Sequence, residues 1–223
     1  MTVGRPSVTL LFAVLATVVA IPVAAGSVTG VVEVLGKNGE PYKHNGEVVV
    51  YLDGIVAKTP AQRERLEMKG KQFRPQVVVV GTGSTVEFPN ADPILHNVFS
   101  VSGDNRFDLD LYKSPQSGEK IFEHAGIVRV YCNIHPQMSA TIVVRNNPYF
   151  TLAEPSGAFR IDGVPPGRYT LKAWHRRATE EAVAEVVVPR DGNATATFSL
   201  DVSKYRRPRH KNKYGKKYKK SKY

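Results

Sequence analysis

An all-β fold is the class that this sequence predicts. Valine-rich runs recur along the chain, and long stretches with the period of an amphipathic helix are scarce. Glycine and proline are frequent, at 18 and 15 residues, and they separate the apolar runs as turns separate strands. With 223 residues, the chain is long enough for one or two domains with a sizeable core.

The first 25 residues have the pattern of an export signal. Arg5 supplies a short basic start, residues 10–21 are apolar, and the small residues Val23-Ala24-Ala25 predict cleavage after Ala25. A membrane anchor is the alternative, but the apolar run is shorter than the about 20 residues that span a bilayer. No cysteine lies near the cleavage point, which argues against a lipid-modified amino terminus. We therefore expect a periplasmic or secreted protein.

A first domain is predicted over residues 26–146, mainly from strands. The stretch 36–46 is rich in Gly, Asn and Pro and is expected to be a turn. A short helix is expected at residues 61–69, because Thr59-Pro60 suits the N-cap and the first helical position. Residues 104–119 are polar and expected to be irregular. The predicted strands of this domain are residues 28–35, 47–52, 76–80, 84–88, 96–101, 120–124, 127–131 and 140–144.

Residues 147–202 are predicted to form a second, smaller β-sandwich. The boundary is placed at Asn146-Asn147-Pro148, after which turns recur every 8–12 residues or so, as in a small sandwich. The predicted strands of this domain are residues 158–161, 168–174, 182–188 and 194–200.

The net charge of +11 arises from the carboxyl-terminal tail. Residues 204–223 hold 11 Lys and Arg and no acid, so the rest of the chain sums to 11 − 11 = 0. The tail at 203–223 is too polar to bury a core and is predicted to be disordered. Its charge and interleaved tyrosines suit an anionic cell-surface polymer or lipid headgroups, a purely solubilising tail being the alternative, and nucleic acid is not expected outside the cytoplasm. The candidate polyanion-binding residues are Arg206, Arg207, Lys216, Lys217, Lys219 and Lys220.

One short motif indicates a metal site. Cys132 is the only cysteine and so cannot form an internal disulfide. It begins a C-x2-H-x2-M loop that continues through His135 to Met138, and His96 lies on a predicted strand upstream. Two imidazoles, a thiolate and a weak axial thioether suit both Cu(I) and Cu(II). The sequence therefore predicts one copper site, with His96, Cys132, His135 and Met138 as its ligands.

Two other interpretations of these residues remain open. Cys132 could be a small buried hydrophobic residue and Met138 a core residue. A Cys/His set could also hold zinc tetrahedrally, although the methionine argues against zinc. The other histidines are expected to have no metal: His44 and His210 to be solvated, His124 to lie on the surface, and His175 to make a structural hydrogen bond.

The segments around these residues resemble the cupredoxins, in particular the plastocyanin and amicyanin group. His96-Asn97-Val98-Phe99 is similar to the family's upstream ligand segment. Val130-Tyr131-Cys132, with His135 and Met138, is similar to its downstream ligand loop in the short amicyanin-like spacing. Residues 83–90 resemble the strand that precedes the first ligand histidine and the Asn that follows it.

The resemblance extends over about residues 27–145. It implies a Greek-key β-sandwich with one type 1 (blue) copper site, in which Asn97 would tie the two ligand segments together by hydrogen bonds. Residues 55–73 and everything after Asn146 depart from the smaller members of the family. Residues 156–171 resemble a transthyretin-like or carboxypeptidase-regulatory-like β-sandwich, a likeness that is nearly silent on function.

The implied function is one-electron transfer between extracytoplasmic redox partners, and the expected partner is a redox protein that the sequence does not identify. One alternative is a periplasmic copper carrier or buffer that uses the same residues. Another is a cell-surface binding or structural protein in which copper is secondary. No acid–base pair or nucleophile arrangement is visible beside the motif, and no second His cluster could build another centre, so we do not expect an enzyme.

Overall fold

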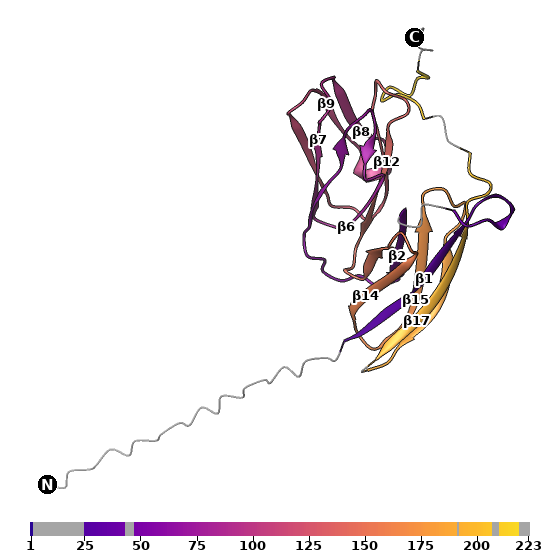
Figure 1. The fold of residues 1–223 in the computed structure, drawn as a ribbon. Helices are drawn as coiled ribbons and strands as arrows, with labels where there is room; N and C mark the ends of the chain where they lie inside the picture. Colours follow the sequence, from indigo (N-terminus) through magenta and orange to yellow (C-terminus); the bar gives the residue numbers. More distant parts are fainter. Residues whose placement is uncertain (2–24, 43–46, 191, 207–209, 219–223) are drawn as a thin grey trace.

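The computed structural model describes residues 1, 25–42, 47–190, 192–206 and 210–218, which form two β-sandwiches and a carboxyl-terminal segment (Figure 1). The predicted export signal lies outside the described residues except for Met1 and Ala25. Strands dominate throughout and the helical elements are single 3₁₀ turns, so the predicted all-β class is confirmed. Among the described residues, no helix is long and apolar enough to cross a membrane.

One sandwich combines the beginning and the end of the chain. Its first sheet has the order β14-β1-β17 and its second the order β13-β2-β15-β16. Its core is built from the inward residues of both sheets, such as Val32, Leu171 and Phe198. The strands are β1 (Gly26–Leu35), β2 (Val48–Asp53), β13 (Phe150–Leu152), β14 (Ala158–Val164), β15 (Gly167–His175), β16 (Ala182–Val188) and β17 (Asn193–Asp201).

The other sandwich is formed by the residues between β2 and β13. Its five-stranded sheet has the order β6-β12-β11-β8-β9 and faces a sheet of order β10-β7-β3, with a small hairpin of β4 and β5 beside them. The two sheets enclose a core that includes Phe88, Phe122 and Ile142. The strands are β3 (Arg63–Arg65), β4 (Glu67–Met68), β5 (Phe73–Arg74), β6 (Val77–Gly81), β7 (Ser84–Pro89), β8 (His96–Ser100), β9 (Phe107–Tyr112), β10 (Ser117–Phe122), β11 (Gly126–Tyr131) and β12 (Ser139–Arg145).

These pairings correct the predicted grouping of the first two strands. They were expected in the domain at 26–146, but β1 pairs with β14 and runs parallel to β17, while β2 pairs with β13 and β15. Figure 1 shows β1 in indigo beside β17 in yellow. The alternation of apolar residues identifies a half-buried strand but does not identify its partner, so the sequence alone could not assign these strands.

The two sandwiches pack together through the outer faces of β2, β6 and β12. Because successive strand residues face opposite sides, Val48, Val50 and Leu52 enter one core, whereas Val49 and Tyr51 face the junction. Their partners there include Val77 of β6 and Val143 of β12, and all four junction residues are buried. The unbroken valine runs of these strands are therefore explained by burial on both faces.

Polar contacts close the same junction. The Arg145 guanidinium lies 3.6 Å from the centroid of the Tyr51 ring and 3.3 Å from Asp53. Within the sheet that contains β2 and β15, Lys172 Nζ lies 2.6 Å from the same carboxyl, and this hydrogen bond lowers the pKa of Asp53 below its ordinary value. The sandwiches are therefore joined by packing and charge as well as by the chain.

The helix expected at residues 61–69 is wrong. Strand β3 runs parallel to β7, and the Leu66 N–H donates to the Glu87 carbonyl at 2.8 Å. Leu66 and Met68 are both fully buried, a spacing of two that suits a strand. The local capping signal at Thr59-Pro60 is overridden by tertiary pairing.

The irregular segment expected at residues 104–119 is also wrong for most of its length. It contains all of β9 and the first part of β10, and β10 pairs with β7 in a continuous antiparallel register. The exposed residues of these strands mix charged side chains, such as Asp108 and Glu119, with the apolar Leu111 and Ile121, which concealed the alternation. The side chains that do turn inward include Tyr112, whose hydroxyl donates to the Phe88 carbonyl at 2.7 Å.

The close approach of β1 and β17 yields a stability prediction. A Cβ at Gly30 would overlap the Ala196 carbonyl oxygen and come within 2.8 Å of the Phe159 ring. Gly30→Ala should therefore lower the free energy of unfolding by about 1–3 kcal/mol, the usual cost of overpacking. The measurement is denaturant unfolding followed by the fluorescence of Trp174, the only tryptophan, which lies in β15 of the same sandwich.

The matched control for this substitution is Gly36→Ala. Gly36 has an ordinary φ of −84°, and the nearest atom to an added Cβ is 3.4 Å away. This variant should unfold within about 0.5 kcal/mol of the wild type, as surface substitutions usually do. Equal loss of stability in the two variants would contradict the tight pairing of β1 with β17.

Candidate metal centre

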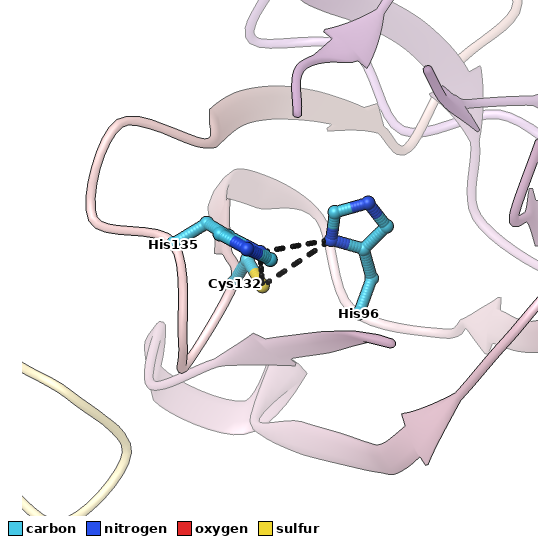
Figure 2. A group of neighbouring side chains, drawn as sticks. All are labelled: His96, Cys132 and His135. Carbon is cyan, nitrogen blue, oxygen red and sulfur yellow. Dashed lines mark hydrogen bonds between the residues drawn. The ribbon is translucent and has the colours of Figure 1, made fainter. Parts of the chain in front are cut away.

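Three of the four predicted ligands come together at one end of the inserted sandwich. His96 is the first residue of β8, Cys132 directly follows β11, and His135 lies in the loop from β11 to β12 (Figure 2). Strands β8 and β11 are neighbours, with Tyr131 paired to Phe99. This antiparallel pairing places His96 and Cys132, which lie 36 positions apart in sequence, at the same end of two neighbouring strands.

The ligand atoms face one another. His96 Nδ1 lies 3.0 Å from His135 Nδ1, and Cys132 Sγ lies 3.6 Å from His135 Nδ1 and 4.0 Å from His96 Nδ1. Figure 2 shows both rings turned toward the thiol. His96 and Cys132 are fully buried, whereas His135 is partly exposed. Within the described part of the chain, this is the one group of three or more His, Cys, Asp or Glu that could hold a metal ion.

The loop from Cys132 to Met138 is closed by its own backbone. The Met138 N–H donates to the His135 carbonyl at 2.9 Å, and the Cys132 N–H donates to the Met138 carbonyl at 3.3 Å. Met138 is fully buried in the same hydrophobic cluster as Cys132. The short loop thus returns the chain to β12 while it holds the thiol and the thioether side chains in one cluster.

Asn97 connects the two ligand segments. Its Oδ1 accepts from the Asn133 N–H at 3.3 Å, and its Nδ2 donates to Asp108 Oδ1 at 2.7 Å and to the Asp110 carbonyl at 2.9 Å. Because the side chain is almost fully buried, these bonds satisfy polar atoms that would otherwise be unpaired. Asn97 thereby holds the loop after Cys132 against β8.

Asp92 is part of the site that sequence reasoning missed. Its Oδ2 lies 2.8 Å from His96 Nε2, on the opposite side of the ring from the thiol. The carboxylate also accepts from the N–H groups of Gly70 and Lys71, at 2.7 and 2.9 Å. The only sequence signal was an acid four residues before His96, and acids at that spacing are common.

The carboxylate determines which nitrogen of His96 can bind a metal. A carboxylate only accepts hydrogen bonds, so Nε2 carries the hydrogen and the Nδ1 lone pair faces Cys132. Burial opposes ionisation of Asp92, but the N–H groups of Lys71 and Gly70 together with His96 bring its pKa below the ordinary value. The charged carboxylate is therefore stable in a largely buried position.

His135 is also prepared to act as a ligand. Burial lowers the pKa of its imidazole below the ordinary value, and the nearby His96 and Lys71 lower it further. The ring therefore stays neutral at neutral pH, with a nitrogen lone pair available to an ion. Its partly exposed edge is the point where the cluster reaches the surface.

The carboxyl-terminal tail packs against the ligand loop, contrary to the prediction of disorder for its described part. The His210 ring stacks on Tyr131 at a centroid distance of 4.1 Å, and its Nε2 donates to the Pro136 carbonyl at 2.8 Å. The Tyr218 hydroxyl donates to the Cys132 carbonyl at 2.9 Å. Lys213 binds Asn133 through its N–H and lies 2.6 Å from Asp108 through Nζ. The expectation that His210 is solvated is therefore wrong.

The remaining predicted residues do not join the cluster. Arg206, Lys216 and Lys217 are exposed in the tail, and His124 is exposed beside β11. His175 is buried, with Nε2 3.7 Å from Glu47. The candidates outside the described residues are His44, Arg207, Lys219 and Lys220.

The donor set fits a single ion that accepts both nitrogen and sulfur. Three atoms separated by 3.0–4.0 Å can all lie about 2.0–2.3 Å from one point, which is the range of metal bonds to imidazole and thiolate. A soft thiolate with imidazoles is typical of copper, zinc and iron, and it disfavours magnesium and calcium, which prefer oxygen. The cluster can therefore hold a transition metal.

No family model and no curated protein matches this chain. Solved structures match part of it. A purple cupredoxin from Nitrosopumilus maritimus is 20% identical, covering 37% of this chain and 99% of its own, with a TM-score of 0.33. Amicyanin from Paracoccus versutus is 22% identical, and the match covers 43% of this chain and 97% of the amicyanin chain, with a TM-score of 0.35. A copper-containing nitrite reductase from Thermus scotoductus SA-01 is 26% identical over 42% of this chain and 24% of its own, with a TM-score of 0.37.

Proposed function

We propose that this protein holds one copper ion and transfers single electrons. His96, Cys132 and His135 would bind the ion, and Met138 would act as a weak fourth ligand. The observation that supports this most directly is the buried cluster in which one thiol and two imidazole nitrogens lie 3.0–4.0 Å apart. When bound there, copper would supply a one-electron change between Cu(I) and Cu(II).

The residues around the cluster suit an ion that changes charge without changing its ligands. Asp92 orients His96 from behind, Asn97 holds the ligand loop, and two backbone bonds close that loop on itself. Ligands fixed in this way need little rearrangement when the ion gains or loses an electron. Met138 favours copper over zinc, because a buried thioether is a ligand for soft ions.

The exposure of the site favours electron transfer over copper carriage. His96 and Cys132 are fully buried, so an ion could not pass to another protein without opening the fold. His135 is partly exposed, and it is flanked by Ile134, which is 42% exposed. This small surface around the His135 edge is where a redox partner could approach. If residues 1–25 are an export signal, that partner is extracytoplasmic.

A copper-binding experiment with a cysteine variant tests the proposal. The purified protein with one equivalent of Cu(II) should show an intense absorption band near ~600 nm that reductant bleaches, as copper–thiolate sites do. Cys132→Ala should lack the band. His124→Ala, which changes an exposed histidine outside the cluster, should keep it. Absence of the band in the wild type, with zinc retained instead, would refute the proposal.

Replacing Asp92 should alter the copper site without removing a ligand. Asp92→Asn removes a negative charge 2.8 Å from His96 Nε2, so the more positive Cu(II) state loses stabilisation and the reduction potential should rise. Copper affinity should fall by about 10–100-fold, the usual effect of changing an outer-shell partner. The measurements are a redox titration of the ~600 nm band and a competition for copper with a chelator.

The control for Asp92→Asn is Asp104→Asn. Asp104 is exposed and lies in the 3₁₀ turn η3 (Gly103–Asn105), away from the described contacts of the cluster. Its loss should leave the potential and the affinity unchanged. An equal shift in the two variants would mean that net charge, not the bond to His96, is responsible.

A further inference from the structure

A cavity of about 340 Å³ lies where the two sandwiches meet the tail. Its walls come from three regions that are distant in sequence: the β11–β12 part of the inserted sandwich, the end of β15 with the turn that follows it, and tail residues 204–206 and 210. The cavity therefore exists only because the whole chain is folded.

The wall of this cavity is strongly basic. It contains five positively charged side chains and no Asp or Glu. None of the five makes an ion pair with a carboxylate among the residues that the structure describes. Asp201 interacts with Lys204 at longer range, and no carboxylate in the described part of the chain pairs directly with any of these charges. The five residues are Arg129, Arg176, Arg177, Lys204 and Arg206.

Two of the arginines are held in place by neutral groups. Arg176 Nη1 donates to Gln76 Oε1, which fixes its direction without neutralising its charge. The Arg177 guanidinium lies 5.2 Å from the centroid of the Tyr42 ring and 5.3 Å from that of Tyr205. Aromatic faces orient a guanidinium and leave its N–H groups available.

An unpaired donor strengthens this argument. Arg177 Nε is buried and has no hydrogen-bond partner among the described residues. A buried N–H without a hydrogen-bond partner is costly, and such donors in native structures commonly mark the place of a ligand, an ion or a water. An oxyanion in the cavity would offset both the repulsion among the five positive charges and the missing hydrogen bond.

We propose that this cavity binds a small, multiply charged oxyanion. Arginine forks match the paired oxygens of phosphate and carboxylate groups, and several of them together select ligands with more than one negative charge. A volume of about 340 Å³ is near the lower limit of ligand pockets, so the occupant is a small molecule and not a polymer. The cavity contains none of the four proposed copper ligands, although Tyr131 and Pro136 beside them line it, and anion binding there does not require copper.

Calorimetric titration of the metal-free full chain tests this proposal. Pyrophosphate and citrate are the probes, at about 0.1 M salt, where exposed charges are largely screened. We expect one equivalent of at least one probe to bind, and the preferred probe distinguishes a phosphate ligand from a polycarboxylate. Arg129→Gln/Arg176→Gln should weaken that binding by at least tenfold. Arg129→Gln alone, at an exposed position, should weaken it by a smaller factor in a variant whose folding is not at risk.

The matched control removes the same charge elsewhere. Lys216→Gln/Lys217→Gln eliminates two exposed tail charges that do not line the cavity, and its affinity should stay within twofold of the wild type. Equal weakening by both double variants would assign the binding to general electrostatic attraction and overturn the site. Failure of the wild type to bind either probe would also overturn it.

Discussion

The structure depends on one long-range pairing, that of β1 with β17. The nine-residue parallel register joins the two ends of the described fold, and the Ser27 hydroxyl donates to Asn193 across 166 positions at 2.5 Å. Because β1 also pairs with β14, the amino-terminal strand is the centre of its sheet. The sandwich that contains β1 and β2 is therefore completed only after the chain has passed through the inserted sandwich and formed β13 to β17. The basic cavity follows from this return of the chain, because residues 204–206, which come directly after β17, form part of its wall.

The metal cluster depends in turn on a segment that looked unrelated to it. The turn between β4 and β5 presents the N–H groups of Gly70 and Lys71, both at positive φ, to the Asp92 carboxylate. That carboxylate binds His96, whose other nitrogen faces Cys132. Each buried polar atom in this series has a partner, which is the condition for burying it. The extra hairpin thus contributes to the chemistry of the cluster as well as to the core.

The sequence predicted what depends on local pattern and composition. The positions of β6, β7, β11 and β12 follow from runs of apolar residues, and the C-x2-H-x2-M spacing brought Cys132 and His135 together with His96. Prediction from the sequence failed where contacts with distant parts of the chain determine the structure of a segment. The pairing of β3 with β7 replaced an expected helix, the partners of β1 changed the domain grouping, and contacts such as Tyr218 with Cys132 ordered part of a tail expected to be disordered. Asp92 was missed because its role depends on a backbone turn 22 positions away.

The central position of β1 has a consequence for biosynthesis. A chain that emerges amino terminus first presents β1 and β2 long before β14 to β17 exist, whereas residues 63–145 already include every strand of the inserted sandwich. During that interval the two early strands expose unpaired edges, which are prone to pair with other chains. A chain terminated prematurely within residues 146–192 would keep the metal ligands but lack β17. Such a product would leave one edge of β1 unpaired, and proteases and chaperones would recognise it as incompletely folded. Survival of the protein in the cell would therefore require β17 to be complete.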